Sequence, residues 1–269
     1  MTFKIVAIDV DDTLLNSKGE ILDSTKVVIK KALEKGIKVV LCTGRPLVGV
    51  SNFLRELEID GLDQYVITFN GAVIESVSGE IVSKLVLNNT DYRGLVSFAD
   101  KHNLPYNVLD DGGSIYTSNL DVNRITVIQA WENQAGVLVR TPDQLSDDFS
   151  IIKGVFVGED VELDQMEDKV HATFDEKFYV VRAAKNFLEV MHKNVNKGRA
   201  LKKLTEKLNI QPNEVIVFGD ELNDLSMFEF AGMAVAMGNG SEFIKSHADF
   251  ITNSNDKDGI AVAMNKFVL

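Results

Sequence analysis

Uninterrupted apolar runs alternate with helical patterns over the first 80 residues, and this alternation limits the fold to a few architectures. Residues 4–8 and 37–42 form strand-like apolar runs, and residues 23–35, which end at Gly36, carry apolar side chains at helical spacing. Strands that are apolar on both faces and joined by helices are typical of a parallel sheet covered on both sides. The sequence therefore predicts an α/β fold with a Rossmann-like parallel-sheet core.

The N-terminal and C-terminal parts of the chain both alternate buried strands with helices, whereas the middle part has a different pattern. The further elements expected in the end segments are helices over 46–58, 197–208 and 222–231 and strands over 65–69, 72–75, 215–218, 233–237 and 250–252. The elements expected between them are strands over 115–117, 137–140, 151–157 and 178–183 and helices over 91–102, 122–132 and 163–173. We predict a core domain formed by residues 1–84 and 195–269, with an inserted α+β cap domain over residues 85–194.

Charge and composition restrict the partners of the chain. Its 269 residues include 40 acidic and 28 basic residues, and the resulting formal charge of -12 repels nucleic acid and anionic membranes. Cys42 is the only cysteine, which excludes an intramolecular disulfide, and the four histidines lack the spacing of a zinc site. No apolar run approaches the roughly 20 residues that cross a bilayer, and Asp9 comes too early for a secretory leader. We expect a cytoplasmic protein without nucleic-acid or membrane partners, and its oligomeric state stays open.

Three of the apolar runs end in polar residues, on the side where open α/β sheets bind ligands. The polar residues that follow them are Asp9 and Asp11, then Thr43, Gly44 and Arg45, and finally Gly219, Asp220, Asn223 and Asp224. Lys197 begins a helix that can bring an ammonium group to the same edge. Taken singly, Asp12, Thr13 and Asp224 fit turns or helix caps, and Lys197 fits a surface charge. Their convergence at one edge indicates a functional site instead.

The side chains of these clusters suit phosphate chemistry with a divalent cation. Carboxylates without histidine or cysteine favour Mg²⁺, and Asp9 and Asp220 are the expected ligands. Mg²⁺ and Lys197 would offset the repulsion between the carboxylates and a phosphate dianion. The groups expected to bind the phosphoryl oxygens are the Thr43 hydroxyl and the backbone N–H groups of Val10 and Gly44.

The spacing of Asp9 and Asp11 permits two separate chemical roles. Asp9 can attack phosphorus to form an aspartyl-phosphate, while Asp11 protonates the leaving oxygen and later deprotonates water. Dividing the displacement into two steps lowers the barrier that each step must cross. This is valuable for the hydrolysis of phosphate monoesters, which is among the slowest reactions that enzymes accelerate. The pair therefore predicts covalent catalysis of phosphoryl transfer.

Four motifs resemble those of the haloacid dehalogenase-like hydrolases. They are DVDDT at 9–13, CTGR at 42–45, NKG at 196–198 and GDELND at 219–224. Their order, and the insertion between the second and the third, are similar to Cof-type phosphatases with a large α+β cap, closest to the YidA-like sugar phosphatases. The resemblance covers essentially the whole chain, including FNG at 69–71 and FLEV at 187–190.

The resemblance implies a role for each matching residue. Asp9 would be the nucleophile, and Asp11 would be the general acid/base and a metal ligand through its backbone. The other residues it implies are Asp220 and Asp224 at the metal site, and Thr43, Gly44, Lys197 and Asn223 around the phosphate. The insertion would be a lid that excludes water and recognises the leaving group. The candidate substrate contacts are Arg45, Asn70 and Glu189, each of which a turn, a cap or a core-edge hydrogen bond would explain equally well.

Asp12 departs from the family pattern, which commonly has glycine at this position. Aspartate is among the few residues that adopt left-handed backbone conformations tolerably. A further buried carboxylate would worsen the charge balance of the site. We therefore expect the Asp12 side chain to face solvent or to cap a nearby N–H group.

The leading hypothesis is a Mg²⁺-dependent phosphatase of small phosphorylated metabolites, with sugar phosphates as the first expectation. A phosphomutase could use the same nucleophile and cap, and product analysis would separate the two. A phospho-acceptor signalling module also places Asp, Thr and Lys at a sheet edge, but such modules are much shorter and lack a large insertion. A non-catalytic sugar-phosphate binder would not need both Asp9 and Asp11. The motifs do not identify the metabolite or the cap residues that contact it.

Overall fold

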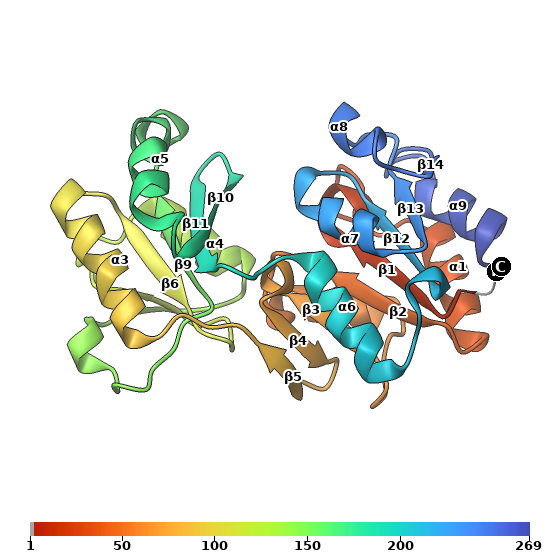
Figure 1. Cartoon of the computed structure of the whole chain (residues 1–269), viewed down its shortest axis with the longest axis horizontal. Helices are drawn as coiled ribbons and strands as arrows, with labels where there is room; N and C mark the ends of the chain where they lie inside the picture. Colours follow the sequence, from red (N-terminus) through yellow and green to blue (C-terminus); the bar gives the residue numbers. More distant parts are fainter. Residues whose placement is uncertain (1–2) are drawn as a thin grey trace. The chain divides into compact units, whose positions relative to one another are not determined.

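The computed structural model describes residues 3–269, which form two compact units. The first unit consists of the described residues up to Ser83 together with Asn196–Leu269, and the second consists of Lys84–Val195. Across the described residues there are two sheets, one of eight strands in the first unit and one of six in the second (Figure 1). The predicted class, an α/β fold with a parallel core and an inserted α+β part, is confirmed.

The sheet of the first unit is parallel except at one edge. Its strands in spatial order are β14 (Phe250–Ile251), β13 (Met233–Ala236), β12 (Val215–Gly219), β1 (Ile5–Asp9), β2 (Lys38–Cys42), β3 (Tyr65–Thr68), β4 (Val73–Ser76) and β5 (Ile81–Lys84). The strands from β14 to β3 pair in parallel, whereas β3 and β4 are antiparallel. Because β1 lies between β12 and β2, the strand that ends in the acidic motif is central in the sheet.

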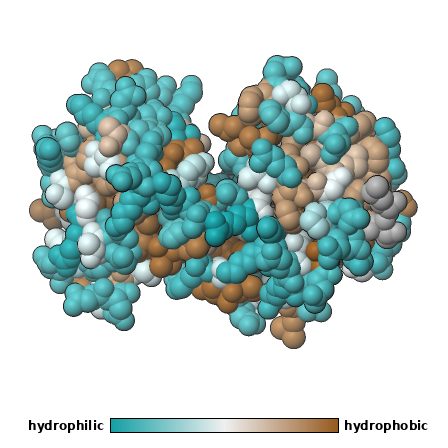
Figure 2. Space-filling view, viewed as in Figure 1, coloured by the Kyte–Doolittle hydropathy of each residue, from teal (hydrophilic) through white to brown (hydrophobic). Residues whose placement is uncertain are grey.

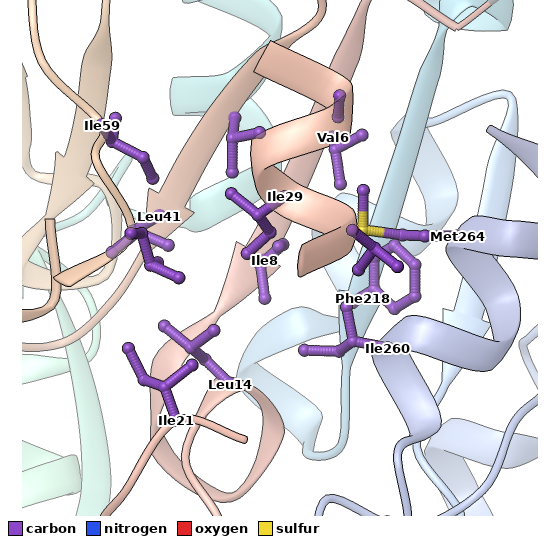
Figure 3. Packing of buried hydrophobic residues seen from close by; sticks show 14 of the residues in the cluster. Val6, Ile8, Leu14, Ile21, Ile29, Leu41, Ile59, Phe218, Ile260 and Met264 are labelled. Atoms are coloured by element: carbon purple, nitrogen blue, oxygen red, sulfur yellow. The ribbon is translucent and has the colours of Figure 1, made fainter. Parts of the chain in front are cut away.

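Helices cover both faces of this sheet (Figure 1). They are α1 (Asp23–Glu34), α2 (Leu47–Glu56), α6 (Lys197–Leu208), α7 (Leu225–Phe230), α8 (Glu242–Lys245) and α9 (Gly259–Phe267). One face packs against α1, α2 and α9, and the other packs against α6 and α7. Figure 3 shows the first of these cores, in which Ile29 of α1 and Met264 of α9 pack with Ile8 and Phe218 of the sheet. Burial on both faces explains why the apolar runs of these strands are uninterrupted.

Asn70 and Gly71 form the tight turn between β3 and β4, at the place where the sequence predicts it. Both have positive φ values, 57° and 98°, which this residue pair adopts readily. A Cβ atom at Gly71 would lie 2.3 Å from the backbone oxygen of Asn196. The turn therefore packs closely against the residue that precedes α6, and the close approach requires glycine.

The structure differs from the expected elements in two ways. The helix expected over 222–231 is divided into a short turn, Leu222–Asp224, and α7. The division arises because the Asp224 carboxylate accepts hydrogen bonds from the backbone N–H groups of Asp220 and Glu221. The elements that the sequence pattern did not predict are α8, α9, β5, β6 and β11. Short segments, and nearly continuous apolar runs such as that of α9, show no clear periodicity in the sequence.

The second unit has a mostly antiparallel sheet with two of its helices packed on one face. Its strands in spatial order are β10 (Phe178–Ala184), β11 (Phe187–His192), β9 (Lys153–Val157), β6 (Tyr106–Leu109), β7 (Ile115–Thr117) and β8 (Val137–Val139), and only the pair formed by β7 and β8 is parallel among the described strands. Its helices are α3 (Asn89–His102), α4 (Arg124–Glu132) and α5 (Asp160–Phe174). Side chains of α3 and α5 share one apolar core with one face of this sheet.

Hydrophilic residues occupy much of the visible surface of each unit (Figure 2), which agrees with the high content of charged side chains. Hydrophobic residues are interspersed among them, as on ordinary protein surfaces. Among residues 3–269, no helix combines the length and the apolar character that crossing a bilayer requires.

Candidate active site

Three neighbouring parallel strands end side by side and bring the polar clusters to one edge. β1 pairs with both β2 and β12, and Asp9 at the end of β1 lies opposite Cys42 at the end of β2. Thr43 directly follows β2, and Asp220 directly follows β12. Because the three strands are parallel, the side chains that follow them meet at the edge where open α/β sheets bind ligands.

Lys197 joins two of the acidic residues. Its Nζ atom lies 2.5 Å from Oδ1 of Asp9 and 2.7 Å from Oδ1 of Asp224. The lysine side chain is only 1% exposed, and both carboxylates are buried. Lys197 is the first residue of α6, where the Asn196 side chain accepts a hydrogen bond from the backbone N–H of Arg199. The start of α6 thus brings the predicted ammonium group into the acidic cluster.

Asp220 and Asp224 are held by hydrogen bonds from the surrounding chain. Oδ1 of Asp220 accepts a hydrogen bond of 2.6 Å from the Thr13 hydroxyl. Oδ2 of Asp224 accepts hydrogen bonds from the backbone N–H groups of Asp220 at 3.0 Å and Glu221 at 3.2 Å. A Cβ atom at Gly219 would lie 2.5 Å from the same oxygen, so glycine leaves the space that the Asp224 side chain occupies. The loop after β12 therefore fixes one oxygen of Asp224 and leaves the other for the ammonium group.

Asp9, Asp220 and Asp224 form a group that can hold a metal ion. One carboxylate oxygen of each lies within 4.8 Å of those of the other two, and all three residues are buried. One buried ammonium group, that of Lys197, lies against these carboxylates, so two negative charges remain unbalanced. A divalent cation would neutralise them, and carboxylate oxygens are the hard ligands that Mg²⁺ prefers. The donor set therefore fits a divalent cation of this kind.

The pKa values in the cluster reflect its excess of negative charge. Burial raises the pKa of Asp9 well above its usual range; the Lys197 ammonium opposes this shift, and the Asp224 and Asp220 carboxylates add to it. Burial, with a contribution from Asp224, also raises the pKa of Asp220 to about 7, against the hydrogen bond from Thr13. Burial lowers the pKa of Lys197, but the attraction of Asp224 and Asp9 outweighs it, so the pKa of the lysine is raised. The metal-free cluster thus favours protonation of Asp9 and Asp220.

The residues expected around a phosphate lie beside one another in the first unit. The backbone N–H of Asn70 donates to the carbonyl of Thr43 at 2.8 Å, and Nδ2 of Asn223 donates to Oδ1 of Asn70 at 3.4 Å. A Cβ atom at Gly44 would lie 3.3 Å from the Asn70 side-chain amide. Thr43 is completely buried, and its hydroxyl oxygen accepts a hydrogen bond from the backbone N–H of Arg45 at 3.1 Å. The Asn70 turn thereby links the loop after β2 to the loop after β12.

Asp11 lies outside the group of three buried carboxylates. Its carboxylate accepts two hydrogen bonds from Arg45, at 2.6 Å from Nη2 and 3.1 Å from Nε. The Asp11 side chain is 53% exposed and that of Arg45 is 33% exposed. A metal contact through the backbone of Asp11 stays a prediction. Val10, whose N–H group is expected to bind phosphate, begins the same turn, Val10–Leu14, and is buried.

Asp12 has the left-handed conformation that the sequence suggested. Its φ is 59°, and the residue is exposed. Its backbone carbonyl accepts a hydrogen bond of 2.8 Å from Nδ2 of Asn239. This agrees with the expectation that the aspartate tolerates the conformation and does not add a buried carboxylate to the site.

Glu189 lies in the second unit, on β11, where its carboxylate accepts a hydrogen bond from the ammonium group of Lys153. It does not belong to the polar groups of the first unit, and its role as a substrate contact stays a prediction. The sequence did not assign roles to Thr13 and Asn196, which position Asp220 and the start of α6. Both residues lie within the motifs DVDDT and NKG, and this position was the only indication in the sequence that they contribute to the site.

Comparisons with known proteins agree with this geometry. Residues 6–264 match the family model of the haloacid dehalogenase-like hydrolases. The phosphatase YwpJ of Bacillus subtilis (strain 168) is 32% identical over 97% of this chain and 98% of its own. The crystal structure of a haloacid dehalogenase-like hydrolase from Bacteroides thetaiotaomicron has a TM-score of 0.88 at 33% identity, covering 98% of this chain and 99% of that chain. The sugar phosphatase BT4131, of HAD subclass IIB, has a TM-score of 0.81 at 26% identity and covers 98% of both chains. With its buried carboxylates at the ends of two neighbouring parallel strands, the chain belongs to the haloacid dehalogenase-like hydrolases.

Proposed function

We propose that this protein is a Mg²⁺-dependent phosphatase that hydrolyses small phosphorylated metabolites, with sugar phosphates as its substrates. Its family and its phosphatase relative support the hydrolysis of phosphate esters, and a sugar phosphatase is among its solved structural relatives. The observation that carries the proposal is the position of Asp9, with Lys197 at 2.5 Å and two further carboxylates close by. This arrangement offers a nucleophile, a fixed cation and metal ligands in one buried place.

The residues that would hold Mg²⁺ are Asp9, Asp220 and Asp224, with the Asp11 backbone as a further ligand. The bound ion would neutralise the negative charge of the carboxylates and of the phosphoryl oxygens. Asp9 must be ionised to attack phosphorus, yet its burial and the neighbouring carboxylates raise its pKa in the metal-free protein. Neutralisation of the cluster is therefore a condition for the nucleophile to work.

We propose two chemical steps on this framework. A carboxylate oxygen of Asp9 attacks phosphorus, the bond to the organic leaving oxygen breaks, and Asp11 gives that oxygen a proton. Asp11, now a carboxylate, then takes a proton from a water molecule whose oxygen attacks the same phosphorus. The aspartyl-phosphate bond breaks, inorganic phosphate leaves, and both aspartates return to their starting states. Lys197 keeps its contact with Asp224 throughout and offsets negative charge beside the reacting carboxylate.

The remaining residues of the first unit would bind the phosphoryl group. We assign this role to the Thr43 hydroxyl, to Asn223 and to the backbone N–H groups of Val10 and Gly44, because these residues follow or flank the ends of β1, β2 and β12. We assign selection of the organic part of the substrate to the second unit, Lys84–Val195. The assignment divides the chain into a part that performs the chemistry and a part that chooses the substrate.

A phosphate-release screen tests the proposal. The panel contains sugar, nucleotide and cofactor phosphates, each assayed with Mg²⁺ and with EDTA. We expect release of inorganic phosphate from sugar phosphates in Mg²⁺ and none in EDTA. Isomerised sugar phosphate without free phosphate would instead identify a phosphomutase, and absence of any reaction across the panel would refute the proposed activity.

A further inference from the structure

The turn that follows β1 has a backbone conformation that is less favourable for aspartate than for glycine. Asp12 lies in the left-handed region, with φ 59° and ψ 5°, and Asp11 before it has φ -76° and ψ 128°, outside the helical range. A residue with a Cβ atom adopts the left-handed region less readily than glycine does. Such conformations persist where the surrounding structure fixes them. The turn therefore depends on its contacts with other segments of the first unit.

Two asparagines from the C-terminal part of the chain, Asn239 and Asn255, hold this turn, and we call them the asparagine pair. Nδ2 of Asn239 donates a hydrogen bond of 2.8 Å to the backbone carbonyl of Asp12. Nδ2 of Asn255, which is 7% exposed, donates one of 2.9 Å to the backbone carbonyl of Leu15. The two asparagines are joined, because Oδ1 of Asn239 accepts from the backbone N–H of Asn255 at 2.9 Å. The pair thus fixes both ends of the segment from Asp12 to Leu15.

The loop after β13, which carries Asn239, also contacts the acidic loop after β12. The backbone N–H of Ser241 donates a hydrogen bond of 3.0 Å to the carbonyl of Asp220. A Cβ atom at Gly240 would lie 2.9 Å from the same oxygen, so glycine allows this close approach. The Asp220 carboxylate in turn accepts the hydrogen bond from Thr13 in the turn after β1. The loop after β13 therefore fixes the turn relative to one of the expected metal ligands.

The contacts of the asparagine pair indicate an action through the turn. Nδ2 of each asparagine donates to a backbone carbonyl, and Oδ1 of Asn239 accepts from a backbone N–H. Direct contact with a phosphoryl group would compete with these hydrogen bonds. Asn239 is exposed, and a hydrogen bond that water can replace contributes little to the free energy of unfolding. Its contact with Asp12 therefore serves the position of the turn more than overall stability.

We propose that Asn239 and Asn255 are positioning residues for Asp11. The inference rests on the proposed function, in which Asp11 gives a proton to the leaving oxygen. Asp11 lies between β1, which pairs with a strand on each side, and the segment that the asparagine pair holds. Its backbone, and hence the direction of its side chain, is restricted from both sides. Loss of the pair would let the turn relax and would move the acid away from the position that proton transfer requires.

Asn239→Ala is the first test, measured as a ratio of two kcat/KM values. The ratio compares the sugar phosphate with the highest kcat/KM in the phosphate-release screen with acetyl phosphate. The alkoxide that leaves a sugar phosphate needs a proton from Asp11, whereas the acetate that leaves acetyl phosphate does not. We expect the ratio to fall about tenfold, part of the roughly 10²–10⁴-fold that a positioned general acid contributes. A smaller folded fraction would lower both kcat/KM values equally and leave the ratio unchanged.

Asn253→Ala is the matched control, at an exposed position of the same loop as Asn255, and it should keep the wild-type ratio. Asn255→Ala is the second variant, because it removes the contact with Leu15 at the other end of the held segment. We expect its ratio to fall severalfold for the same reason. A wild-type ratio in either folded variant, Asn239→Ala or Asn255→Ala, would overturn the inference.

Hydrogen exchange of the Leu15 amide separates this inference from the proposed activity. This N–H donates to the carbonyl of Val10 at 3.0 Å and closes the turn. In Asn239→Ala we expect its exchange to become about fivefold faster relative to that of Ile8 in β1, which reports on global unfolding. If the wild type released no phosphate from any compound of the screen, the proposed function would fail and the exchange rate alone would decide the inference. An unchanged relative rate at Leu15 would overturn it in either case.

Discussion

The Nζ atom of Lys197 lies 2.5 Å from Oδ1 of Asp9, in a cluster where 1% of the lysine side chain is exposed. The same ammonium group lies 2.7 Å from Oδ1 of Asp224. A buried lysine that bridges two carboxylates offsets part of their negative charge and fixes their positions. Loss of the lysine therefore leaves two buried carboxylates without their cation, which affects both stability and catalysis.

Replacement of Asp9 by asparagine should abolish turnover and preserve the fold. The change removes the charge of the nucleophile at nearly constant volume, and it reduces the excess of negative charge in the cluster. Phosphate release measures the loss, and circular dichroism with thermal unfolding checks the fold. Normal phosphate release by Asp9→Asn would contradict covalent catalysis by this residue.

Lys197→Met should lower the free energy of unfolding by about 3–5 kcal/mol, because it leaves two buried carboxylates without their cation. Phosphatase activity should be lost as well. Lys202→Met, at an exposed position of the same helix, is the control and should change stability by less than about 0.5 kcal/mol. Urea unfolding at pH 7 in EDTA measures the free energy of unfolding of both variants. Equal values for the two would show that the buried ion pairs contribute nothing to stability.

The metal-free protein should lose stability as the pH rises from about 4 to 7. Burial raises the pKa of Asp220 to about 7, so between its unfolded pKa of 3.8 and this value the folded state binds the proton that the unfolded state has released. The free energy of unfolding then falls with increasing pH, by up to about 1.4 kcal/mol per pH unit for one group. Denaturant unfolding in EDTA at several pH values measures the slope. Asp220→Asn removes the titration of this group and should make the fall in stability with pH less steep, while Asp9, whose pKa is also raised, still contributes. An unchanged slope in that variant would show that Asp220 does not cause the pH dependence.

Calcium should inhibit the proposed activity when it replaces magnesium. Ca²⁺ adopts looser and higher coordination than Mg²⁺, so the reacting groups would be positioned less tightly around three carboxylates. Phosphate release in matched concentrations of the two ions measures the difference. Undiminished activity in Ca²⁺ would contradict the proposed requirement for Mg²⁺.

Gly71→Ala should destabilise the protein more than Gly61→Ala. Both glycines have positive φ values, 98° and 96°, so alanine is strained at either position. A Cβ atom at Gly71 would also lie 2.3 Å from the backbone oxygen of Asn196, whereas one at Gly61 meets no atom within 4 Å. We expect the steric conflict to cost about 1–3 kcal/mol more at Gly71. The difference in thermal unfolding between the two variants isolates this contact, and equal losses would show that the turn can move away from α6.

The sheet and the acidic cluster could be predicted because their signals are local. Apolar runs mark the strands, and the residues after β1, β2 and β12 meet because parallel strands share an edge. The placement of Asp9, Asp220 and Lys197 in one cluster followed from that reasoning. The start and end of α6 also match the predicted helix over 197–208, because its apolar side chains recur at helical spacing.

Other features depend on contacts between residues that are far apart in the sequence. The local sequence pattern does not predict such contacts. The pairing of Asp11 with Arg45, and that of Lys153 with Glu189, join residues on different strands or loops. Helix α9 was missed because its nearly continuous apolar run has no period that separates a helix from a strand. Asp224 was expected within a helix, but its hydrogen bonds to the preceding backbone end the turn before α7.

The position of β1 between β2 and β12 has a consequence for how the chain is synthesised. Ile5 pairs with Val215, so one edge of the central strand has no partner until almost the whole chain, including the second unit, has left the ribosome. Asp9 likewise has no ammonium partner until Lys197 has been synthesised. A nascent or truncated chain that stops before β12 exposes an unpaired apolar strand, which is a template for aggregation. The first unit therefore completes its folding only after the insertion has been made.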